Sequence, residues 1–265
     1  MNRQKILALE KEMFGNVHDA YKQSVAIAWD SSSSYAKAVD RILSLHLSRL
    51  DSRASILDIG GASRWWIRRF GRETQAIVLD LSSTFLHSVA AENRWKMLLG
   101  ANCEALPLDS ASFDLVLIQG VLHHVPDQRL ALAEAGRILR PGGTLIVIEP
   151  AKWSVALVYY LIKRLVYIFF GTWGLRRILR YYGSPHESFV SPAIIRCILG
   201  PPRFSVYLTK TTPFRFPYIG KATSTRVYRA LENALNRTVF ARWFGSYLFA
   251  EISRSFVAQT VSKRD

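Results

Sequence analysis

Acidic residues and glycines stand where a nucleotide-like cofactor could be held. The stretch SILDIGGASRWW, residues 55–66, has a short apolar run that meets Asp58 and continues into Gly60 and Gly61. Glycine has no Cβ, so such a turn is tight and lets a ligand approach the main chain. A second apolar run ends at Asp80, where a carboxylate can accept hydrogen bonds from both hydroxyls of a ribose. A glycine turn alone does not identify the cofactor.

Two adjacent histidines are the candidates for proton transfer. His123 and His124 follow another apolar run, and either imidazole can take a proton near neutral pH. The alternative is that they pack against or cap the next helix. Further along, His186 and Glu187 could reach a substrate, or Glu187 could pair with one of many arginines. The sequence shows no His and carboxylate grouping with metal-ligand spacing, so we expect no metal site.

Short apolar segments alternate with helical ones around these residues. The segments carry almost no polar alternation, which is typical of strands buried on both faces by helices, and hence of a parallel, doubly wound α/β sheet. Asp127 is the expected cap of one helix, with Pro141 ending it, and Ser82 or Ser83 caps another. The predicted strands are 55–59, 76–81, 97–102, 113–120, 144–150, 203–211 and 246–254.

Residues 54–150 resemble the class I S-adenosylmethionine-dependent methyltransferases of the type 11 kind, motif by motif. The order and spacing of the motifs make the resemblance specific, although no single motif is. It implies a Rossmann-like, doubly wound seven-stranded sheet with an antiparallel last strand, N-terminal helices and a helical insert after strand five. The matching segments are ILDIGGAS, VLDLS, GANCEALPLDSASFDLVLIQGVLHHVPD and RILRPGGTLIVIEP.

The resemblance extends more loosely to the end of the chain and implies one methyltransferase domain over residues 1–265. Its expected parts are N-terminal helices at 1–50, a cofactor-binding core at 54–150, a basic aromatic insert at 151–190 and a closing helix and strands at 191–265. The N-terminal segment contains Phe14, Tyr21, Trp29 and Tyr35. These aromatic residues indicate either packing against the core or a lid over a pocket.

S-adenosyl-L-methionine is the co-substrate that the resemblance implies. Asp58 would orient its methionine end, and the main chain at Gly60 and Gly61 would touch it. Asp80 would hold the ribose, with Leu81 beside the adenine.

Three further segments would complete that site. Asn102 stands where the family usually has an Asp that meets the adenine amino group, and its amide still offers an acceptor. Cys103 would add a main-chain contact, and Gln119 and Gly120 would border the methionine moiety.

The glycine turn departs from the family pattern. Ala62 occupies the second glycine position and Arg64 the third in an ungapped match. A positive φ at a non-glycine residue costs about 1–3 kcal/mol. The turn therefore either binds cofactor with Ala62 at negative φ, or belongs to a degenerate fold that serves as a binding or scaffold protein.

Charge is distributed unevenly along the 265 residues. The net charge is +15, and residues 151–265 carry 18 Lys and Arg against 4 Asp and Glu, together with 22 of the 32 aromatic residues. Such asymmetry indicates an anionic partner. Two cysteines, Cys103 and Cys197, are too few for a disulfide framework. The charged N-terminus does not resemble a signal peptide, so we expect a cytoplasmic protein, peripheral on the inner face of a membrane.

The segment 153–183 has three interpretations. It is a membrane-surface element, an apolar wall of an acceptor pocket, or a nucleic-acid surface, and its apolar density makes the last less favoured. Its longest apolar run, Val155 to Ile162, is far short of the about 20 residues that span a bilayer. The residues expected to contact lipid are Trp153, Tyr159, Tyr160, Lys163, Arg164, Phe169, Phe170, Trp173, Arg176, Arg177 and Arg180.

We therefore expect a methyltransferase that acts on a small or lipid-linked acceptor at a membrane surface. An RNA methyltransferase is the alternative enzyme, although no acceptor motif of the N-P-P-Y type is present. Nothing in the sequence fixes the acceptor or the oligomeric state.

Overall fold

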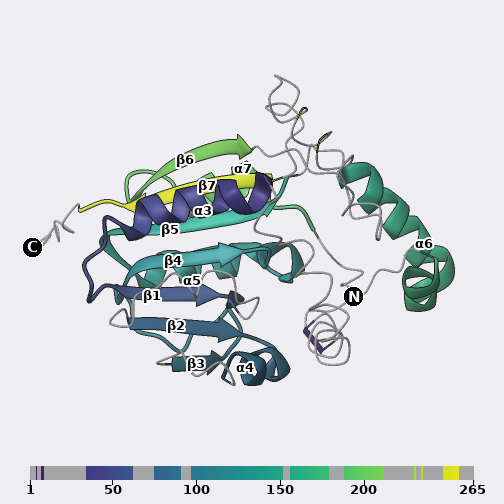
Figure 1. Ribbon diagram of the computed structural model, residues 1–265, viewed down its shortest axis with the longest axis horizontal. Helices are drawn as coiled ribbons and strands as arrows, with labels where there is room; N and C mark the ends of the chain where they lie inside the picture. Colours follow the sequence, from purple (N-terminus) through teal and green to yellow (C-terminus); the bar gives the residue numbers. More distant parts are fainter. Residues whose placement is uncertain are drawn as a thin grey trace, which may run out of the picture.

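A computed structural model describes residues 4, 7–8, 34–61, 75–90, 97–151, 156–178, 188–211, 230, 234 and 247–256. These residues contain a sheet of seven strands in the order β3-β2-β1-β4-β5-β7-β6 (Figure 1). The strands are β1 (Ser55–Ile59), β2 (Gln75–Asp80), β3 (Met97–Gly100), β4 (Phe113–Gln119), β5 (Leu139–Pro150), β6 (Phe204–Thr211) and β7 (Tyr247–Arg254).

Strands β1 to β5 are parallel, and β7 runs antiparallel between β5 and β6. The chain changes direction of winding between β1 and β4, because β2 and β3 lie on one side of β1 and the later strands on the other. The seven-stranded, doubly wound sheet with an antiparallel last strand is thus confirmed. In such a sheet the ligand site lies at the carboxyl ends of the strands beside this switch point.

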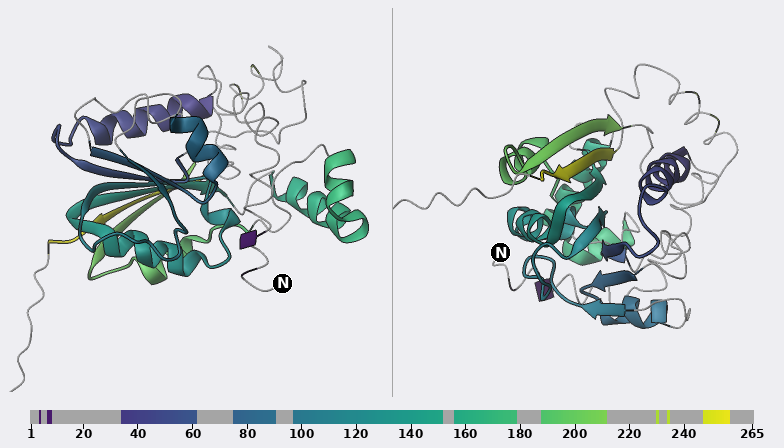
Figure 2. Two further views of the ribbon diagram at one scale, coloured as in Figure 1. Left: turned by 90° about the horizontal axis from the view of Figure 1, so that it is seen from below. Right: turned by 90° about the vertical axis from the view of Figure 1, so that its left-hand side faces the viewer.

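Helices cover both faces of the sheet (Figure 2). Helices α3 (Ser34–Leu47) and α4 (Ser83–Ala90) lie on one face, and α5 (Gln128–Ile138) and α7 (Pro192–Ile198) on the other. Val39 and Leu43 of α3 are buried against Ile56 and Ile148 of the sheet, so this helix packs on the core. Phe14, Tyr21 and Trp29, for which packing or a lid was expected, lie outside the described residues, as does the side chain of Tyr35.

The end of α5 and the start of β5 differ from the prediction. We expected Pro141 to stop the helix and the strand to begin at 144. The helix ends at Ile138, and β5 begins at once with Leu139 paired to Phe113. The register then shifts between Phe113 and Leu115. Residues 141–143, Pro-Gly-Gly, therefore lie in an irregular part of β5 and do not form a separate turn. Asp127 caps α5 as predicted, accepting from the main-chain N–H groups of Arg129 and Leu130.

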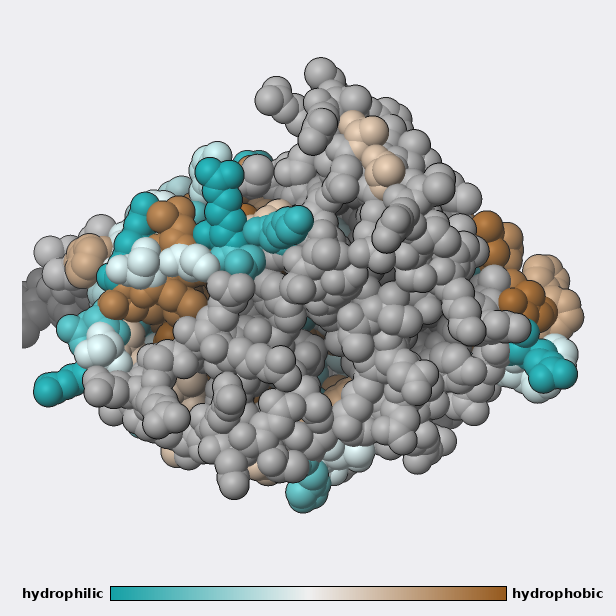
Figure 3. Space-filling model, in the orientation of Figure 1, coloured by the Kyte–Doolittle hydropathy of each residue, from teal (hydrophilic) through white to brown (hydrophobic). Residues whose placement is uncertain are grey.

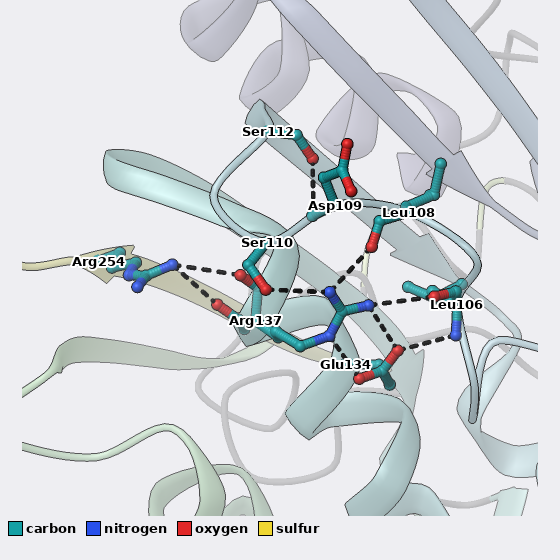
Figure 4. Close-up of polar contacts among 9 residues, drawn as sticks. Leu106, Leu108, Asp109, Ser110, Ser112, Glu134, Arg137 and Arg254 are labelled. Carbon is teal, nitrogen blue, oxygen red and sulfur yellow. Dashed lines mark hydrogen bonds and ion pairs between the residues drawn. The ribbon is translucent and has the colours of Figure 1, made fainter.

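Arg137 of α5 fixes the loop between β3 and β4 (Figure 4). Its guanidinium donates to the main-chain oxygens of Leu106 and Leu108, at 3.1 and 2.8 Å, and to the hydroxyl of Ser110. It also pairs with Glu134 at 2.7 Å, a hydrogen bond that lowers the pKa of that carboxyl. Glu134 in turn accepts from the main-chain N–H of Leu106. The loop that follows β3 is therefore held against α5 by a charged network.

Helix α6 (Ala156–Arg177) stands beyond the carboxyl ends of the strands (Figures 1 and 2). It is broken at Gly171, whose φ of 60° and ψ of −156° are not helical. Ala151, directly after β5, pairs with Val190 in an isolated parallel bridge. The chain between these residues therefore leaves the sheet and returns to the place it left.

Candidate functional site

A cavity lies at the carboxyl ends of β1, β2 and β4, where the topology places a ligand. Leu7, near the N-terminus, also lines it. The remaining wall is mainly apolar and includes Phe85 and Val125. The predicted site residues that line the cavity are Gly60, Asp80, Leu81, Asn102, Cys103, Gly120 and His124.

The glycine turn after β1 is packed tightly on both sides. Gly60 has a φ of +72°, and a Cβ there would lie 2.2 Å from Cγ2 of Val121. A Cβ on Gly61 would lie 2.1 Å from Oδ2 of Asp58. Both positions therefore require glycine, the first for conformation and space and the second for space. Ala62 and Arg64, which carry the departure from the family pattern, lie outside the described residues.

Asp58 is a buried acid beneath this turn. It is 1% exposed, and its Oδ2 atom has no hydrogen-bond partner among the described residues. Burial, with the negative charge of Asp80 as the second cause, raises the pKa of the Asp58 carboxyl to about 8. At neutral pH this carboxyl is therefore mostly protonated, and a cation nearby would favour its ionised form.

Asp80 ends β2 at the cavity wall. Its Oδ1 accepts from the main-chain N–H of Ser82 at 2.8 Å, which starts the turn into α4. Ser82 then caps that helix, since its hydroxyl accepts from the N–H of Phe85. The carboxylate is thus held by the main chain while it lines the cavity.

Asn102 and Cys103 form the next part of the wall, after β3. Asn102 closes a turn with Glu104: its side-chain oxygen accepts from the main-chain N–H, and its Nδ2 donates to the carboxylate at 3.1 Å. Glu104 is buried and also accepts from the N–H of Asp127 at 2.7 Å. Burial, followed by the charge of Glu104, raises the pKa of the Cys103 thiol to about 12. This thiol is therefore protonated and not a nucleophile.

The turn after β4 is organised by one buried carboxylate. Gly120, with φ of +64°, leads into the short helix η3 (Leu122–His124). Glu149, at the end of β5 and fully buried, accepts from the main-chain N–H groups of Val121 and Leu122, both at 2.8 Å. Its second oxygen lies 2.7 Å from Nδ1 of His123. Since this carboxylate acts as an acceptor throughout, Nδ1 carries the proton and Nε2 is the basic atom of a neutral His123 ring.

The two histidines differ in environment. Their ring centroids are 4.0 Å apart. The pKa of His124 lies well below its usual range because of burial, then because of the charges of His123 and Lys163. His124 is therefore a neutral part of the cavity wall, whereas His123 is oriented by a carboxylate.

Not every predicted residue lines the cavity. Asp58 lies beneath the glycine turn, and Gly61 belongs to that turn without lining the cavity. Gln119 precedes Gly120 in the chain and His123 packs behind it, and neither is part of the wall. His186 and Glu187 lie outside the described residues. Within the described ranges, no group of three His, Cys, Asp or Glu side chains could hold a metal ion.

Two organising acids were missed in the sequence. Glu149 ends an apolar strand in the same way as Asp80, so the rule that singled out Asp80 would have found it. Glu104 has no such signal, because it lies in an irregular loop and its role depends on the N–H of Asp127.

Comparison with known proteins identifies relatives of this fold. Residues 57–147 match a family model described as a methyltransferase domain. The ubiquinone/menaquinone biosynthesis C-methyltransferase UbiE of Neisseria gonorrhoeae is 30% identical over 155 residues, which are 54% of this chain and 63% of the relative. The chain thus spans less than two thirds of the length of that relative.

Solved structures share the fold at low sequence identity. A SAM-dependent methyltransferase from Thermotoga maritima has a TM-score of 0.54 at 18% identity and covers 92% of this chain and 99% of its own. The [4+2]-cyclase SpnF has a TM-score of 0.55 at 16% identity, covering 94% and 96%. The fold therefore occurs in proteins named for different reactions, and it does not by itself fix the reaction.

The raised pKa of Asp58 gives a pH dependence of stability. The pKa of this carboxyl is 3.8 in the unfolded chain and about 8 in the folded chain. Between these two pH values the folded protein therefore binds one proton that the unfolded chain has lost. The free energy of unfolding should then fall as pH rises, by up to about 1.4 kcal/mol per pH unit from this group. Asp58→Asn should remove that contribution, as measured by denaturant unfolding from about pH 5 to about pH 8.

Asp109→Asn is the matched control, because Asp109 is an exposed acid in the loop after β3. This variant should keep the slope of the wild type. An identical pH slope in wild type and Asp58→Asn would contradict the raised pKa.

Proposed function

We propose that the chain is a class I S-adenosylmethionine-dependent methyltransferase that transfers a methyl group to a small or lipid-linked acceptor at a membrane surface. The observation that carries this proposal is the cavity at the switch point of the sheet, walled by six of the residues predicted to hold the cofactor. The same chain segment would form a single catalytic domain. S-adenosylmethionine supplies, when bound, an electrophilic methyl group on a positively charged sulfur.

The charges of the site fit a cationic co-substrate. Asp58 has a buried oxygen without a partner among the described residues, and Asp80 is the second charge acting on it. A ligand that carries a sulfonium and an ammonium group would relieve the repulsion between these two carboxylates. In this role the Asp58 carboxyl lies beneath Gly61 and would orient the methionine end of the co-substrate indirectly, either through the main chain of the turn or through a bridging water molecule.

The remaining wall fits the nucleoside part. Asp80 would accept from the ribose hydroxyls, and Leu81 would lie against the adenine ring. The side-chain oxygen of Asn102 already accepts from Glu104, yet it has a second lone pair for the adenine amino group. The main chain of Cys103 would add a further contact to the co-substrate. Gly120, preceded in the chain by Gln119, would border its methionine part.

His123 is the residue that would receive the acceptor proton. The Glu149 carboxylate holds Nδ1 at 2.7 Å and so leaves Nε2 as the basic atom. S-adenosylmethionine would supply the methyl group and keep the electrons of the broken carbon–sulfur bond. The His123 ring lies directly behind the wall at Gly120, where its Cε1 would be 3.9 Å from a Cβ on that glycine, and Nε2 would take the acceptor proton from there. His124 contributes wall surface.

Helix α6 supports the membrane part of the proposal. It presents large apolar side chains to solvent, which Figure 3 shows as a hydrophobic area at the right-hand end of the molecule. Arg164 and Arg177 are exposed on the same helix, which contains no acidic residue. None of the described helices is long and apolar enough to cross a bilayer. The exposed apolar residues of α6 are Leu161, Ile162, Leu165, Ile168, Phe169, Phe170 and Trp173, and Ile178 directly after the helix is also exposed.

The exposure of the α6 side chains supports the membrane interpretation of this segment over the other two. Phe169, Phe170 and Trp173 are exposed by 73%, 53% and 63%, which fits a lipid-facing surface better than the wall of an acceptor pocket. Lys163, which we expected at the lipid surface, is buried at 2% exposure because its side of the helix faces the protein. The outer surface, apolar with basic residues, fits an anionic bilayer better than RNA. Trp153 and Arg180 lie outside the described residues.

The names of the relatives suggest which class of acceptor to test first. They are named for C-methylation in ubiquinone and menaquinone biosynthesis. A hydroxylated ring dissolved in or attached to a lipid matches both that name and the exposed surface of α6. We therefore take a hydroquinone ring as the first acceptor to test.

Calorimetric binding of S-adenosylmethionine and S-adenosylhomocysteine tests the cofactor site. Asp80→Asn should weaken both by roughly tenfold to a hundredfold, because a charged acceptor to ribose hydroxyls contributes about 1.5–3 kcal/mol. Asp109→Asn, an exposed acid of the loop after β3, should bind like the wild type.

Failure of the folded wild type to bind either compound would contradict the proposed function. It would favour the degenerate fold used as a scaffold.

Transfer of a tritiated methyl group to reduced 1,4-naphthoquinone tests the proton acceptor. His123→Asn should lower kcat by roughly 100-fold to 10,000-fold, the usual contribution of a general base, and leave S-adenosylhomocysteine affinity unchanged. His87→Asn, an exposed histidine on α4, is the control. An unchanged pH profile of kcat in His123→Asn would rule out this role.

Co-sedimentation with vesicles tests the α6 surface. The double variant Ile168→Ser/Phe169→Ser should bind vesicles of equal phosphatidylglycerol and phosphatidylcholine at least about tenfold more weakly, because each side chain contributes about 1.5–3 kcal/mol when buried. Tyr207→Ser, at an equally exposed aromatic residue on β6, should behave like the wild type.

Equal vesicle binding by the wild type, the double variant and Tyr207→Ser would refute a contact between α6 and the bilayer. Retention of a structured RNA in a gel shift, with no response to vesicles, would favour the RNA methyltransferase instead.

A further inference from the structure

Asn102 lines the cavity with an amide where the sequence resemblance places a carboxylate. A carboxylate has two equivalent acceptor oxygens, so it can accept from an amino group whichever way it is turned. An amide has one acceptor end and one donor end, and it accepts only through its oxygen. The orientation of the Asn102 amide therefore decides which base this part of the wall can recognise.

Glu104 fixes that orientation through two contacts. Its main-chain N–H donates to Oδ1 of Asn102 at 3.0 Å, and Nδ2 of Asn102 donates to Oε2 of the Glu104 carboxylate at 3.1 Å. A main-chain N–H can only donate, so the end of the amide that faces it has to be the oxygen. Turning the amide around would place donor against donor and acceptor against acceptor, and both contacts would be lost.

The Glu104 side chain is itself held from helix α5. Glu104 is 4% exposed, and its Oε1 accepts from the main-chain N–H of Asp127 at 2.7 Å. Asp127 is the N-cap of α5, where its side chain accepts from the N–H groups of Arg129 and Leu130. Because Oε1 and Oε2 each accept from a donor, both contacts require a carboxylate at position 104. The start of α5 thus sets the orientation of the amide in the cavity wall.

Asn102 lies close to the acid that would hold the ribose. Asp80 pairs with Gly100 across β2 and β3, and the N–H of Ala101 donates to the main-chain oxygen of Asp80 at 3.2 Å. Asp80 and Asn102 both line the cavity. The wall therefore presents a carboxylate and an oriented amide on neighbouring strand ends, as the sugar and the base of one nucleoside would require.

The oriented amide is complementary to one kind of base. Beyond its contacts with Glu104, the Asn102 oxygen has a second lone pair and the nitrogen a second hydrogen. Adenine carries an amino donor next to a ring nitrogen that accepts, so it can use either group. Hypoxanthine has a carbonyl oxygen and a protonated ring nitrogen at the same positions, and the donor and acceptor are exchanged.

We propose that Glu104 is a positioning residue for base recognition: it orients the Asn102 amide so that the cavity selects a nucleoside whose base has an amino group beside an unprotonated ring nitrogen. This inference rests on the proposed function and names what selects the nucleoside part of the co-substrate. It belongs to the asparagine of this chain. A carboxylate at position 102 would have no orientation to fix, and the Glu104 carboxylate would repel it.

Calorimetric titration with two nucleosides tests the role of Glu104. The probes are S-adenosylhomocysteine and S-inosylhomocysteine, which differ only in the base. The wild type should prefer the adenine compound by at least about tenfold. Glu104→Gln should bring that preference close to unity, because its side chain has one acceptor oxygen for two donors, the N–H of Asp127 and Nδ2 of Asn102.

An exchange of the amide and the carboxylate gives the sharper test. Asn102→Asp alone should weaken binding of S-adenosylhomocysteine by about tenfold or more at about pH 8, because two carboxylates then face each other. In the double variant Asn102→Asp/Glu104→Gln the new amide can accept from Asp127 and donate to the new carboxylate. Its affinity and its preference for the adenine compound should return to within roughly threefold of the wild type.

Asp109→Asn, at an exposed acid of the same loop, is the control and should keep the wild-type preference. The inference is overturned by equal binding of the two compounds to the wild type, by an unchanged preference in Glu104→Gln, or by a double variant that binds no better than Asn102→Asp. Equal weakening for both compounds in Glu104→Gln would show a merely structural residue and would also overturn it.

The double variant keeps the contacts of residue 104 with residue 102 and with Asp127, so it decides the question if Glu104→Gln does not fold. Failure of the proposed function is distinguishable, because the folded wild type would then bind neither nucleoside.

Discussion

The buried carboxylate of Glu149 is the contact on which the acceptor end of the site depends. A fully buried charge is costly unless it is well hydrogen-bonded. Here three donors at 2.7–2.8 Å converge on it, all from the turn that follows β4. Strand β5 thereby fixes the turn of its neighbour strand. The His123 ring, the main chain of Val121 and the cavity wall at Gly120 are consequently placed by one side chain.

The same turn connects the sheet to the region around α6. The main-chain N–H of Ser188 donates to the oxygen of His123 at 2.8 Å, and Gln128 of α5 donates to the hydroxyl of Ser188. Two residues later, Val190 bridges to Ala151. The described residues on either side of α6 in the sequence, Ala151 and Val190, are therefore anchored to each other and to the turn after β4.

Much of the fold followed from local patterns, because buried parallel strands are apolar on both faces. Runs such as residues 113–119 and 144–150 need no long-range information to be identified, and Asp58 and Asp80 stand out as acids that interrupt or end them. The start of β5 was misjudged because the pairing of Leu139 with Phe113 depends on the neighbouring strand. The burial of Lys163 could not be predicted, since α6 is apolar on most sides and its sequence does not show which side packs.

Helix α6 combines two properties that bear on the proposed function. It exposes apolar residues such as Phe169 together with basic residues such as Arg164, and it stands beyond the carboxyl ends of the strands (Figure 1). The cavity lies at those same strand ends. Under the proposed function, a surface of this kind would hold the molecule on a bilayer with the cofactor side of the sheet toward the lipid-attached acceptor.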